Sequence, residues 1–370
     1  MRKAYKYRIY PTKAQNETLD QQLALCCQLY NAGLQERRDA YRICGKSITY
    51  TEQQNQLPEI KKSNPEFKAI HSQVLQDVLQ RVDKAFAGFF SRLAKGRTAG
   101  YPRFRSRPRY DSLSYPQSGF QLEGRKLVLS KIGKVRIKQH RALAGRSKTL
   151  SIKREAGRWY ACFSVEIEPV PLPVTNAAIG IDVGLESFAV LSDGTAIENA
   201  RYYREAEKTL RVTQRRVARR KKGSERRKKA VRLLQRAHAH IRNQRADFHH
   251  QTARKLVNGY GKIVVEDLNI KGLAGGLLAK SVNDAGWSAF FAKLAYKAAE
   301  AGRELIKVDP RGTSQRCPCG APNPKTLSQR RHQCNVCGLD IARDHASALE
   351  ILRLGLSLHA STQPVAAYVA

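Results

Sequence analysis

Three short apolar runs, far apart in the chain, each carry an acidic residue at one end. Asp182 closes the run AAIGID, Glu266 closes KIVVE, and Asp344 precedes the apolar segment ASALEIL. An acid at a strand end projects from a rigid edge, and several carboxylates that converge there form a pocket that divalent cations can neutralise. Taken singly, each acid has a simpler role as a turn former or a helix N-cap. The three acids are nevertheless the first candidates for a metal-binding catalytic site.

The remainder of the chain is strongly basic. Lysine and arginine outnumber aspartate and glutamate 67 to 31, which gives a net charge of +36 and an isoelectric point near 10.2. Such an excess is typical of proteins that bind nucleic acid, because phosphate binding releases counterions. Ribosomal or chromatin-like packing would explain the charge alone. An acidic pocket inside a polycation instead predicts an enzyme that cuts nucleic acid.

Membrane insertion and secretion are not expected. No apolar stretch approaches the ~20 residues that cross a bilayer, and the N-terminal MRKAYKYRIYPTKAQ has no apolar segment typical of a signal peptide. We therefore expect a cytoplasmic protein with no membrane partner. Four of the eight cysteines cluster at ligand spacing. The others are expected to be reduced core residues: Cys26, Cys27, Cys44 and Cys162.

The first half of the chain combines helices with short strands. Alternation predicts a strand over residues 3–9, and helical periodicity predicts helices over 15–42 and 74–93, so residues 11–95 are expected to form a helical domain. A basic, aromatic loop follows. Turn signals then separate short β runs, as in a small barrel. These runs cover 119–122, 126–129, 134–138, 149–154 and 159–166.

A new domain is expected from residue 174. Strands over 178–183, 187–191 and 195–198 precede a long helical segment, 201–257, interrupted at Gly223-Ser224. A strand over 262–265, a helix over 287–301, a strand over 304–308 and a helix over 344–358 complete the order. Alternating strands and helices predict a mixed α/β sheet. With the acids in the order strand, strand, helix, this is the pattern of a ribonuclease-H-like nuclease core.

Cations are concentrated in the long helical segment. Residues 201–245 hold 18 lysines and arginines against three acids. A solvated helix face is the usual reading of such a run, but this imbalance favours binding to an RNA or heteroduplex backbone. In the basic loop, Tyr101, Phe104 and Tyr110 either stack on bases or pack the loop. The candidate contact residues are Arg103, Arg105, Arg215, Arg216, Arg219, Arg220, Lys221, Lys222, Arg226 and Arg227.

Two close cysteine pairs predict a structural zinc site. Cys317-Pro-Cys319 and Cys334-Asn-Val-Cys337 are separated by 14 residues rich in turn formers, as in a zinc ribbon. Four free buried cysteines are the alternative. The first pair is CxC rather than the usual CxxC, and His332 is a possible substitute ligand.

These motifs resemble the TnpB (OrfB) family of insertion-sequence proteins, the RuvC-like relatives of type V CRISPR effectors. The matching segments are GIDVGL, VVEDLNIKGL, WSAFFAKLAYKAAEAG, Thr313-Ser314-Gln315, CGLDIARDHASALEIL, KIGKVRIKQHR and YPRFRSRPRYDSLSYPQSGF. The resemblance covers nearly the whole chain. It implies a multidomain α+β protein, with a split β-barrel (wedge) over 1–10 and 96–172 around the helical recognition domain 11–95. An RNase H-like (RuvC) domain over 174–370 would carry the zinc ribbon, 313–340.

The same resemblance implies an RNA-guided DNA endonuclease of a bacterial or archaeal transposable element. Its partners would be a guide RNA from the element's own end and double-stranded target DNA beside a short adjacent motif. Asp182, Glu266 and Asp344 match the family's catalytic triad and would bind two Mg²⁺ or Mn²⁺ ions about 4 Å apart. The last motif departs from the family's Asp-Arg-Asp-x-Asn at Ala342 and Ala346.

Two other functions are compatible with the sequence. Weakened nuclease chemistry would leave an RNA-guided DNA-binding repressor. An accessory protein of transposition is another alternative. The transposase itself would need a nucleophile such as a tyrosine beside a metal-binding histidine pair, and His249-His250 is the available pair.

Overall fold

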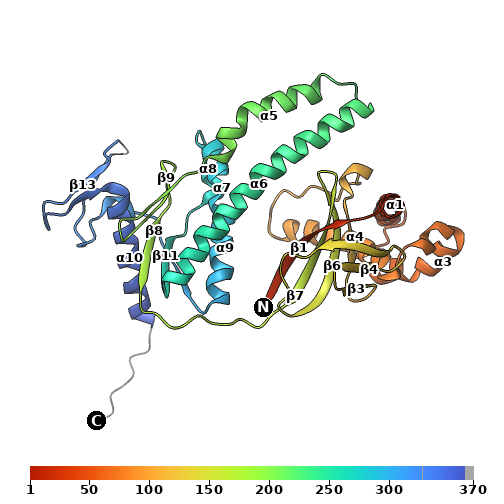
Figure 1. Ribbon diagram of the computed structural model, residues 1–370, viewed down its shortest axis with the longest axis horizontal. Coiled ribbons are helices and arrows are strands. Elements are labelled where there is room, and N and C mark those ends of the chain that lie inside the picture. Colours follow the sequence, from red (N-terminus) through yellow and green to blue (C-terminus); the bar gives the residue numbers. More distant parts are fainter. Residues whose placement is uncertain (327, 363–370) are drawn as a thin grey trace, which may run out of the picture. The chain divides into compact units, whose positions relative to one another are not determined.

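The computed structural model describes residues 1–326 and 328–362 of the chain. The chain divides into two compact units, Met1–Glu168 and a second that begins at Pro169. Each unit is built around its own β-sheet (Figure 1). None of the helices in the described part of the chain is long and apolar enough to cross a membrane.

The first unit contains a seven-stranded antiparallel sheet in the order β2-β6-β7-β1-β5-β4-β3. Alternating burial of Tyr5, Tyr7 and Ile9 explains the central position of β1. The sheet has two edges, β2 and β3, so strand pairing does not close the predicted barrel. The strands are β1 Arg2–Tyr10, β2 Ser112–Tyr115, β3 Phe120–Glu123, β4 Lys126–Leu129, β5 Gly133–Lys138, β6 Arg146–Glu155 and β7 Arg158–Glu166.

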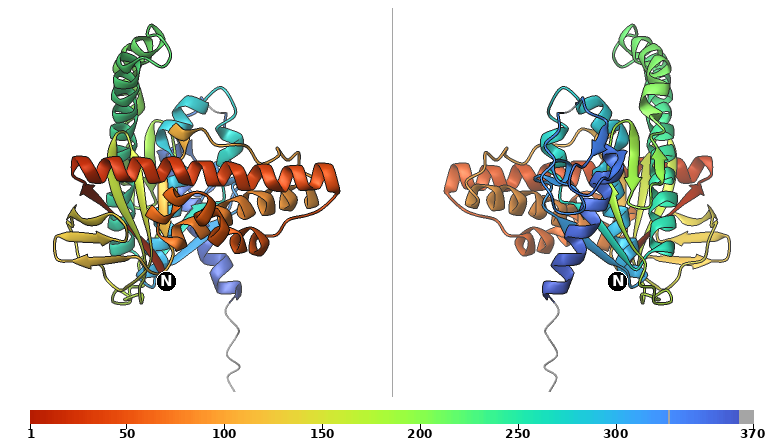
Figure 2. Two further views of the ribbon diagram at one scale, coloured as in Figure 1. Left: turned by 90° about the vertical axis from the view of Figure 1, so that its right-hand side faces the viewer. Right: turned by 90° about the vertical axis from the view of Figure 1, so that its left-hand side faces the viewer.

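Two long helices pack into the same core as this sheet. A capping box between Thr12 and Gln15 starts α1, Lys13–Cys44. This helix packs against α4, Ser72–Ala94 (Figure 2). The prediction for the scattered cysteines is wrong for Cys44, which is exposed at the end of α1, and Cys162 is only half-buried. Short helical segments between and after them are α2 Tyr50–Asn55, α3 Leu57–Ser63, η1 Pro65–Ala69 and η2 Arg107–Arg109.

The second unit contains a five-stranded mixed sheet in the order β10-β9-β8-β11-β12. Strands β8, β11 and β12 are parallel, and β9 and β10 continue the sheet antiparallel. The apolar runs at β8 and β11 are buried on both faces, as is usual for parallel strands. The strands are β8 Ala178–Asp182, β9 Ser187–Leu191, β10 Ala196–Glu198, β11 Lys262–Glu266 and β12 Glu304–Val308. With the first unit, this gives an α+β protein.

Helices cover both faces of the second sheet. Ile179 and Ile181 of β8 face a core that includes residues of α6 (Glu225–Gly259) and α9 (Trp287–Glu300). The opposite face carries Gly180 and Val264 and packs against α10, Arg343–Thr362. A Cβ on Gly180 would lie 2.2 Å from the backbone oxygen of Ala348, so this close approach requires glycine.

The basic segment forms a helical hairpin rather than one helix. Helix α5, Tyr202–Ala218, and helix α6 are joined by a loop that starts at Arg219, earlier than the predicted break at Gly223. Two short helices, α7 Ile270–Leu273 and α8 Ala279–Ala285, follow β11 and were not predicted. The cysteine module, which we define as residues 313–342, contains η3 Thr313–Gln315 and the hairpin of β13 Arg331–Gln333 and β14 Asp340–Ala342.

Candidate functional site

Asp182 and Glu266 end neighbouring parallel strands at the same level. The register pairs Val264 with Gly180 and Val265 with Ile181, and the next residue on each strand is the acid. Neighbouring strands lie about 4.8 Å apart, and residues two apart on one strand share a face. Asp182 and Glu266 therefore project from adjacent positions on the face that packs against α10.

The third acid is delivered to this face by α10. His345 of α10 contacts the Ser192 carbonyl after β9, Nε2 to O 3.2 Å. Ala348 lies over Gly180 of β8, and a Cβ on Gly355 would meet Val264 of β11 at 2.3 Å. Because α10 crosses the strands in this order, Asp344 enters at the β9–β8 side of the face that carries the other two acids.

The negative charges of Glu266 and Asp344 both act on Asp182. Burial raises the pKa of Asp182 well above its usual range, and the negative charges of Glu266 and Asp344 raise it further, while Arg343 opposes them. Burial also raises the pKa of Glu266, against a hydrogen bond from Thr313. Strongly perturbed carboxyl groups of this kind are typical of functional sites.

The carboxylate oxygens of the three acids lie farther apart than the ligand atoms of a single metal ion. Glu266 Oε1 accepts a hydrogen bond from Thr313 Oγ1 at 2.5 Å, and Asp344 Oδ1 lies 3.3 Å from Arg343 Nε. Across residues 1–326 and 328–362, the four cysteines are the one group of three or more potential ligands close enough to hold a metal ion. The structure therefore brings the acids to one face and leaves two of them bonded to protein partners.

The cysteine group fits a tetrahedral zinc ion. The Sγ atoms of Cys317, Cys319, Cys334 and Cys337 all lie within 4.8 Å of one another. Two of the distances are 3.6 Å and 3.8 Å, close to the ~3.8 Å that Zn–S bonds of 2.3 Å impose in a tetrahedron. Backbone amides of Cys337 and Val336 lower the pKa of the Cys334 thiol to about 6, which favours the thiolate that zinc binds.

The CxC spacing does not prevent this arrangement. The Cys317 amide donates to Ala321 O at 2.9 Å, and Gly320 takes a φ of 93°, so the first knuckle turns within a few residues. His332 is not a substitute ligand. It is buried outside the group, where its ring contacts Asn323 and Lys325.

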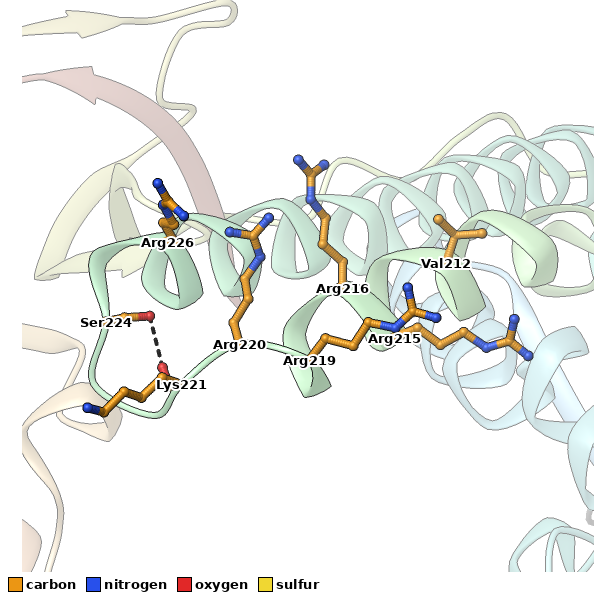
Figure 3. Close-up of a pocket in the computed structure, with 8 residues that line it drawn as sticks. All are labelled: Val212, Arg215, Arg216, Arg219, Arg220, Lys221, Ser224 and Arg226. Carbon is orange, nitrogen blue, oxygen red and sulfur yellow. Dashed lines mark hydrogen bonds between the residues drawn. The ribbon is translucent and has the colours of Figure 1, made fainter.

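Six of the eight cations predicted in the basic segment line one groove at the tip of the α5–α6 hairpin (Figure 3). Lys222 and Arg227 lie in the same loop and first turn of α6 but outside the lining. Ser224 Oγ donates to Lys221 O at 2.9 Å and closes the loop. None of the described residues that line the groove is acidic. Its residues are Val212, Arg215, Arg216, Arg219, Arg220, Lys221, Ser224 and Arg226.

The basic loop of the first unit is partly packed. Tyr110 is 1% exposed, so of the two alternatives it packs the loop and does not stack on bases. Tyr101 packs edge-on against Phe86 and Phe89, whereas Phe104 remains 48% exposed. The guanidinium of Arg105 stacks over Tyr30 at 5.1 Å, and Arg103 is exposed.

The histidine pair does not form a metal site. His249 is buried against Phe188, with Nε2 2.9 Å from Ala285 O, and burial lowers its pKa to about 4. His250 faces Tyr296 instead, Nδ1 to the hydroxyl 3.4 Å. This arrangement counts against a transposase that uses these histidines.

Two residues without a predicted role lie beside the acids, Thr313 and Arg343. The sequence placed Thr313 in a matching motif and gave no sign that its hydroxyl reaches Glu266. Arg343 directly precedes Asp344, so the sequence alone places it beside that acid.

Comparison with known proteins identifies the family. A model described as "Probable transposase" of the OrfB IS605 type matches residues 162–276. A Cas12f1-like TNB domain matches residues 287–351, and a helix-turn-helix domain matches residues 1–46. The chain belongs to the TnpB (OrfB) family, which the sequence motifs had predicted.

Two relatives align with almost the whole chain, and a third aligns with about half of it. A Streptomyces pristinaespiralis protein named "Putative RNA-guided DNA endonuclease" is 34% identical over 97% of this chain and 91% of its own length. The Escherichia coli protein InsQ, of the same description, is 30% identical over 95% and 92%. A Sulfoacidibacillus thermotolerans Cas12f1 endodeoxyribonuclease is 29% identical over 52% and 50%.

A solved Cas12f1 complex with sgRNA and target DNA overlays on 95% of this chain and 99% of that chain. The TM-score is 0.36 and the identity is 16%.

Proposed function

We propose that this protein is an RNA-guided, divalent-metal-dependent DNA endonuclease of a transposable element. The observation that carries the proposal is the matched register of Asp182 and Glu266 on β8 and β11, with Asp344 on the same face. Relatives with the name RNA-guided DNA endonuclease, aligned along nearly the full chain, support it.

The three acids would hold two Mg²⁺ or Mn²⁺ ions. Oxygen-only ligands suit hard cations. Burial and the charges of Glu266 and Asp344 raise the pKa of Asp182, so bound cations would favour its ionised form. When bound, such a pair of ions supplies an activated water and stabilises the leaving oxygen in phosphodiester hydrolysis. The ladder of β8 and β11 fixes the separation of two ligands. Arg343, paired with Asp344, balances part of the negative charge before ions bind.

The cysteine module would bind one structural Zn²⁺ and belongs to an RNase H-like (RuvC) domain over 174–370. The domain plan would otherwise be that of the family: a wedge formed by residues 1–10 and 96–172, and a helical recognition region over 11–95. These assignments rest on the resemblance and on the element order of the two sheets.

Nucleic acid would bind along the α5–α6 hairpin. The groove lined by Arg215, Arg216, Arg219, Arg220, Lys221 and Arg226 suits a phosphate backbone, because these cations have no acid beside them in the lining. Pairing of the guide RNA with the target strand would supply sequence specificity, and the protein would grip the hybrid through its backbone. Lys222, Arg227, Arg103 and Arg105 are further candidate contacts.

The direct test is cleavage by the complex loaded with its own RNA. The protein is expressed with the flanking DNA of its element, and the RNA that copurifies is sequenced. We expect a discrete RNA species and Mg²⁺-dependent cleavage of a matched supercoiled plasmid, abolished in Asp182→Ala. Random RNA in the preparation would overturn the guided model.

A guided DNA-binding protein that does not cut is the second candidate. One observation favours it: Ala342 and Ala346 stand where the family motif has an acid and an asparagine. A wild-type complex that binds matched DNA without cutting it would select this function.

A further inference from the structure

We propose that Thr313 is a positioning residue for Glu266, and that through its hydroxyl the cysteine module sets the nuclease site. The inference rests on the proposed function, since it takes Glu266 as a metal-binding acid. Thr313 itself is 4% exposed and lies where the chain leaves β12 and enters the module.

The contact between the two side chains is short and directional. Thr313 Oγ1 lies 2.5 Å from Glu266 Oε1 and 3.1 Å from Pro310 O. A hydroxyl has one proton, so it donates to one acceptor at a time. Donation to an ionised carboxylate is the stronger bond. The hydroxyl therefore fixes the rotation of the Glu266 carboxylate while Glu266 is ionised.

Thr313 is held in place by the module that follows it. The Gln315 side chain donates to Lys325 O at 2.9 Å and accepts from Lys325 N at 2.6 Å. The Gln315 carbonyl accepts from Asn323 N at 2.8 Å. Cys317, a predicted zinc ligand, comes two residues after Gln315. The short helix that contains Thr313 is thus hydrogen-bonded to residues 323 and 325 of the cysteine module, which a bound zinc ion would stabilise.

The module also ends at an acid. The β13–β14 hairpin runs into Arg343, whose amide donates to Arg330 O at 2.8 Å, and Asp344 is the next residue. The module therefore spans two of the three acids: it contacts Glu266 at its start and leads into Asp344 at its end. If both ends of the module set metal-binding acids, a zinc ion bound to its cysteines would stabilise the nuclease site as well as the module. Hydrogen bonds from outer residues orient metal ligands in the same way elsewhere, and their loss typically weakens metal binding by about 10- to 100-fold.

The test compares variants that differ in the donor. Thr313→Val and Thr313→Ala remove the hydroxyl, with and without retaining volume. Thr313→Ser keeps it. Ser314→Ala deletes a hydroxyl in the same helical turn and serves as the matched control. Mn²⁺ affinity is measured by calorimetry on the full, zinc-loaded chain stripped of nucleic acid. The Mg²⁺ concentration for half-maximal cleavage is measured on the RNA-loaded complex, and zinc content is measured for every variant.

We expect Thr313→Val and Thr313→Ala to weaken Mn²⁺ binding by about tenfold or more and to raise the required Mg²⁺ concentration similarly. Their zinc content and target binding should match the wild type. Thr313→Ser and Ser314→Ala should stay within about twofold. Wild-type Mn²⁺ affinity in the two donor-free variants would overturn the inference, as would an equal loss in Thr313→Ser.

Glu266→Gln separates this inference from the proposed function. If Glu266→Gln also keeps wild-type Mn²⁺ affinity and cleavage, the assignment of the acids is wrong. If Glu266→Gln loses both while Thr313→Val loses neither, only the positioning role is wrong.

Discussion

Asp284 and Arg245 form an ion pair at the base of the α5–α6 hairpin, with Oδ1 3.2 Å from Nη2 and the Asp284 side chain only 3% exposed. The same carboxylate accepts hydrogen bonds from the backbone amides of Tyr203 and Arg204 at 2.9 and 3.2 Å. Asp284 therefore anchors the first turn of α5, where the helix dipole favours a negative charge. The basic groove at the far end of the hairpin depends on this anchor for its orientation.

Replacement of Asp284 by alanine should destabilise the first turn of α5 and its attachment to α6. Removing one partner of a buried ion pair costs about 3 kcal/mol or more, because Arg245 and two amides lose their acceptor. We expect faster hydrogen exchange in α5 and a lower melting temperature, measured by mass spectrometry and calorimetry. Asp284→Asn should be milder, since it retains an acceptor. Unchanged exchange in both variants would contradict the anchoring role.

Removal of the Asp182 charge should stabilise the metal-free protein. Its pKa is raised in the folded state, so ionisation of Asp182 favours unfolding as pH rises above the unfolded value of about 3.9. Asp182→Asn should therefore abolish cleavage yet raise the melting temperature in EDTA at pH 7. Added Mg²⁺ should stabilise only the wild type. A lower melting temperature for Asp182→Asn in EDTA would show that the acids do not repel one another.

His249 should make the protein sensitive to acid. Burial lowers its pKa to about 4 from the model-compound 6.5, so the unfolded chain binds this proton more readily than the folded one. Stability is fully present above pH 6.5 and falls toward pH 4, by about 3 kcal/mol from this residue. Melting temperatures of the wild type and His249→Gln, compared from pH 7 to pH 4.5, should converge as pH falls. A parallel decline of the two curves would exclude His249 as the cause.

The groove cations should dominate the salt dependence of RNA binding. Each phosphate contact contributes about 0.7 to 0.9 to the slope of log K against log salt concentration. Arg219→Ala/Arg220→Ala should reduce that slope by about 1.5, measured by filter binding from low to high salt. Lys61→Ala/Lys62→Ala, in α3 of the first unit, is the charge-matched control and should change the slope less. Equal effects of the two pairs would indicate that only net charge matters.

Zinc removal should disorganise the cysteine module. The wild type should carry one zinc per chain, and Cys334→Ser should lose it, as measured by atomic emission. Because metal binding supplies the folding free energy of such small modules, the metal-free module should exchange amide hydrogens rapidly. Retention of one zinc by Cys334→Ser would contradict the four-cysteine site.

Sequence patterns predicted the elements that carry strong periodicity. The apolar runs of β8 and β11, and the amphipathic stripes of α1 and α4, appear within a few residues of their predicted ends. Strand β2, Ser112–Tyr115, was missed because its serines alternate with only two apolar residues beside a basic loop. The four-residue α7 has too few positions for a helical period to register.

The site was predicted in part. The sequence predicted that Asp182 and Glu266 end strands. Their adjacent positions depend on the register between β8 and β11, which are far apart in the chain, and no sequence pattern predicted that register. The same is true of Thr313, whose contact with Glu266 links residues 47 apart in sequence. The sequence could not predict that Tyr110 is buried and Phe104 exposed, because both lie among arginines and only the packing of the loop distinguishes them.

The matched level of the two strand-end acids also describes how such a chain could lose its chemistry. Deleting a single residue early in β8 would move Asp182 one step along the ladder and turn it toward the helices behind the sheet. The arginine-rich hairpin would be unchanged, so this single deletion would give a protein that still binds its RNA and its target but no longer cleaves DNA.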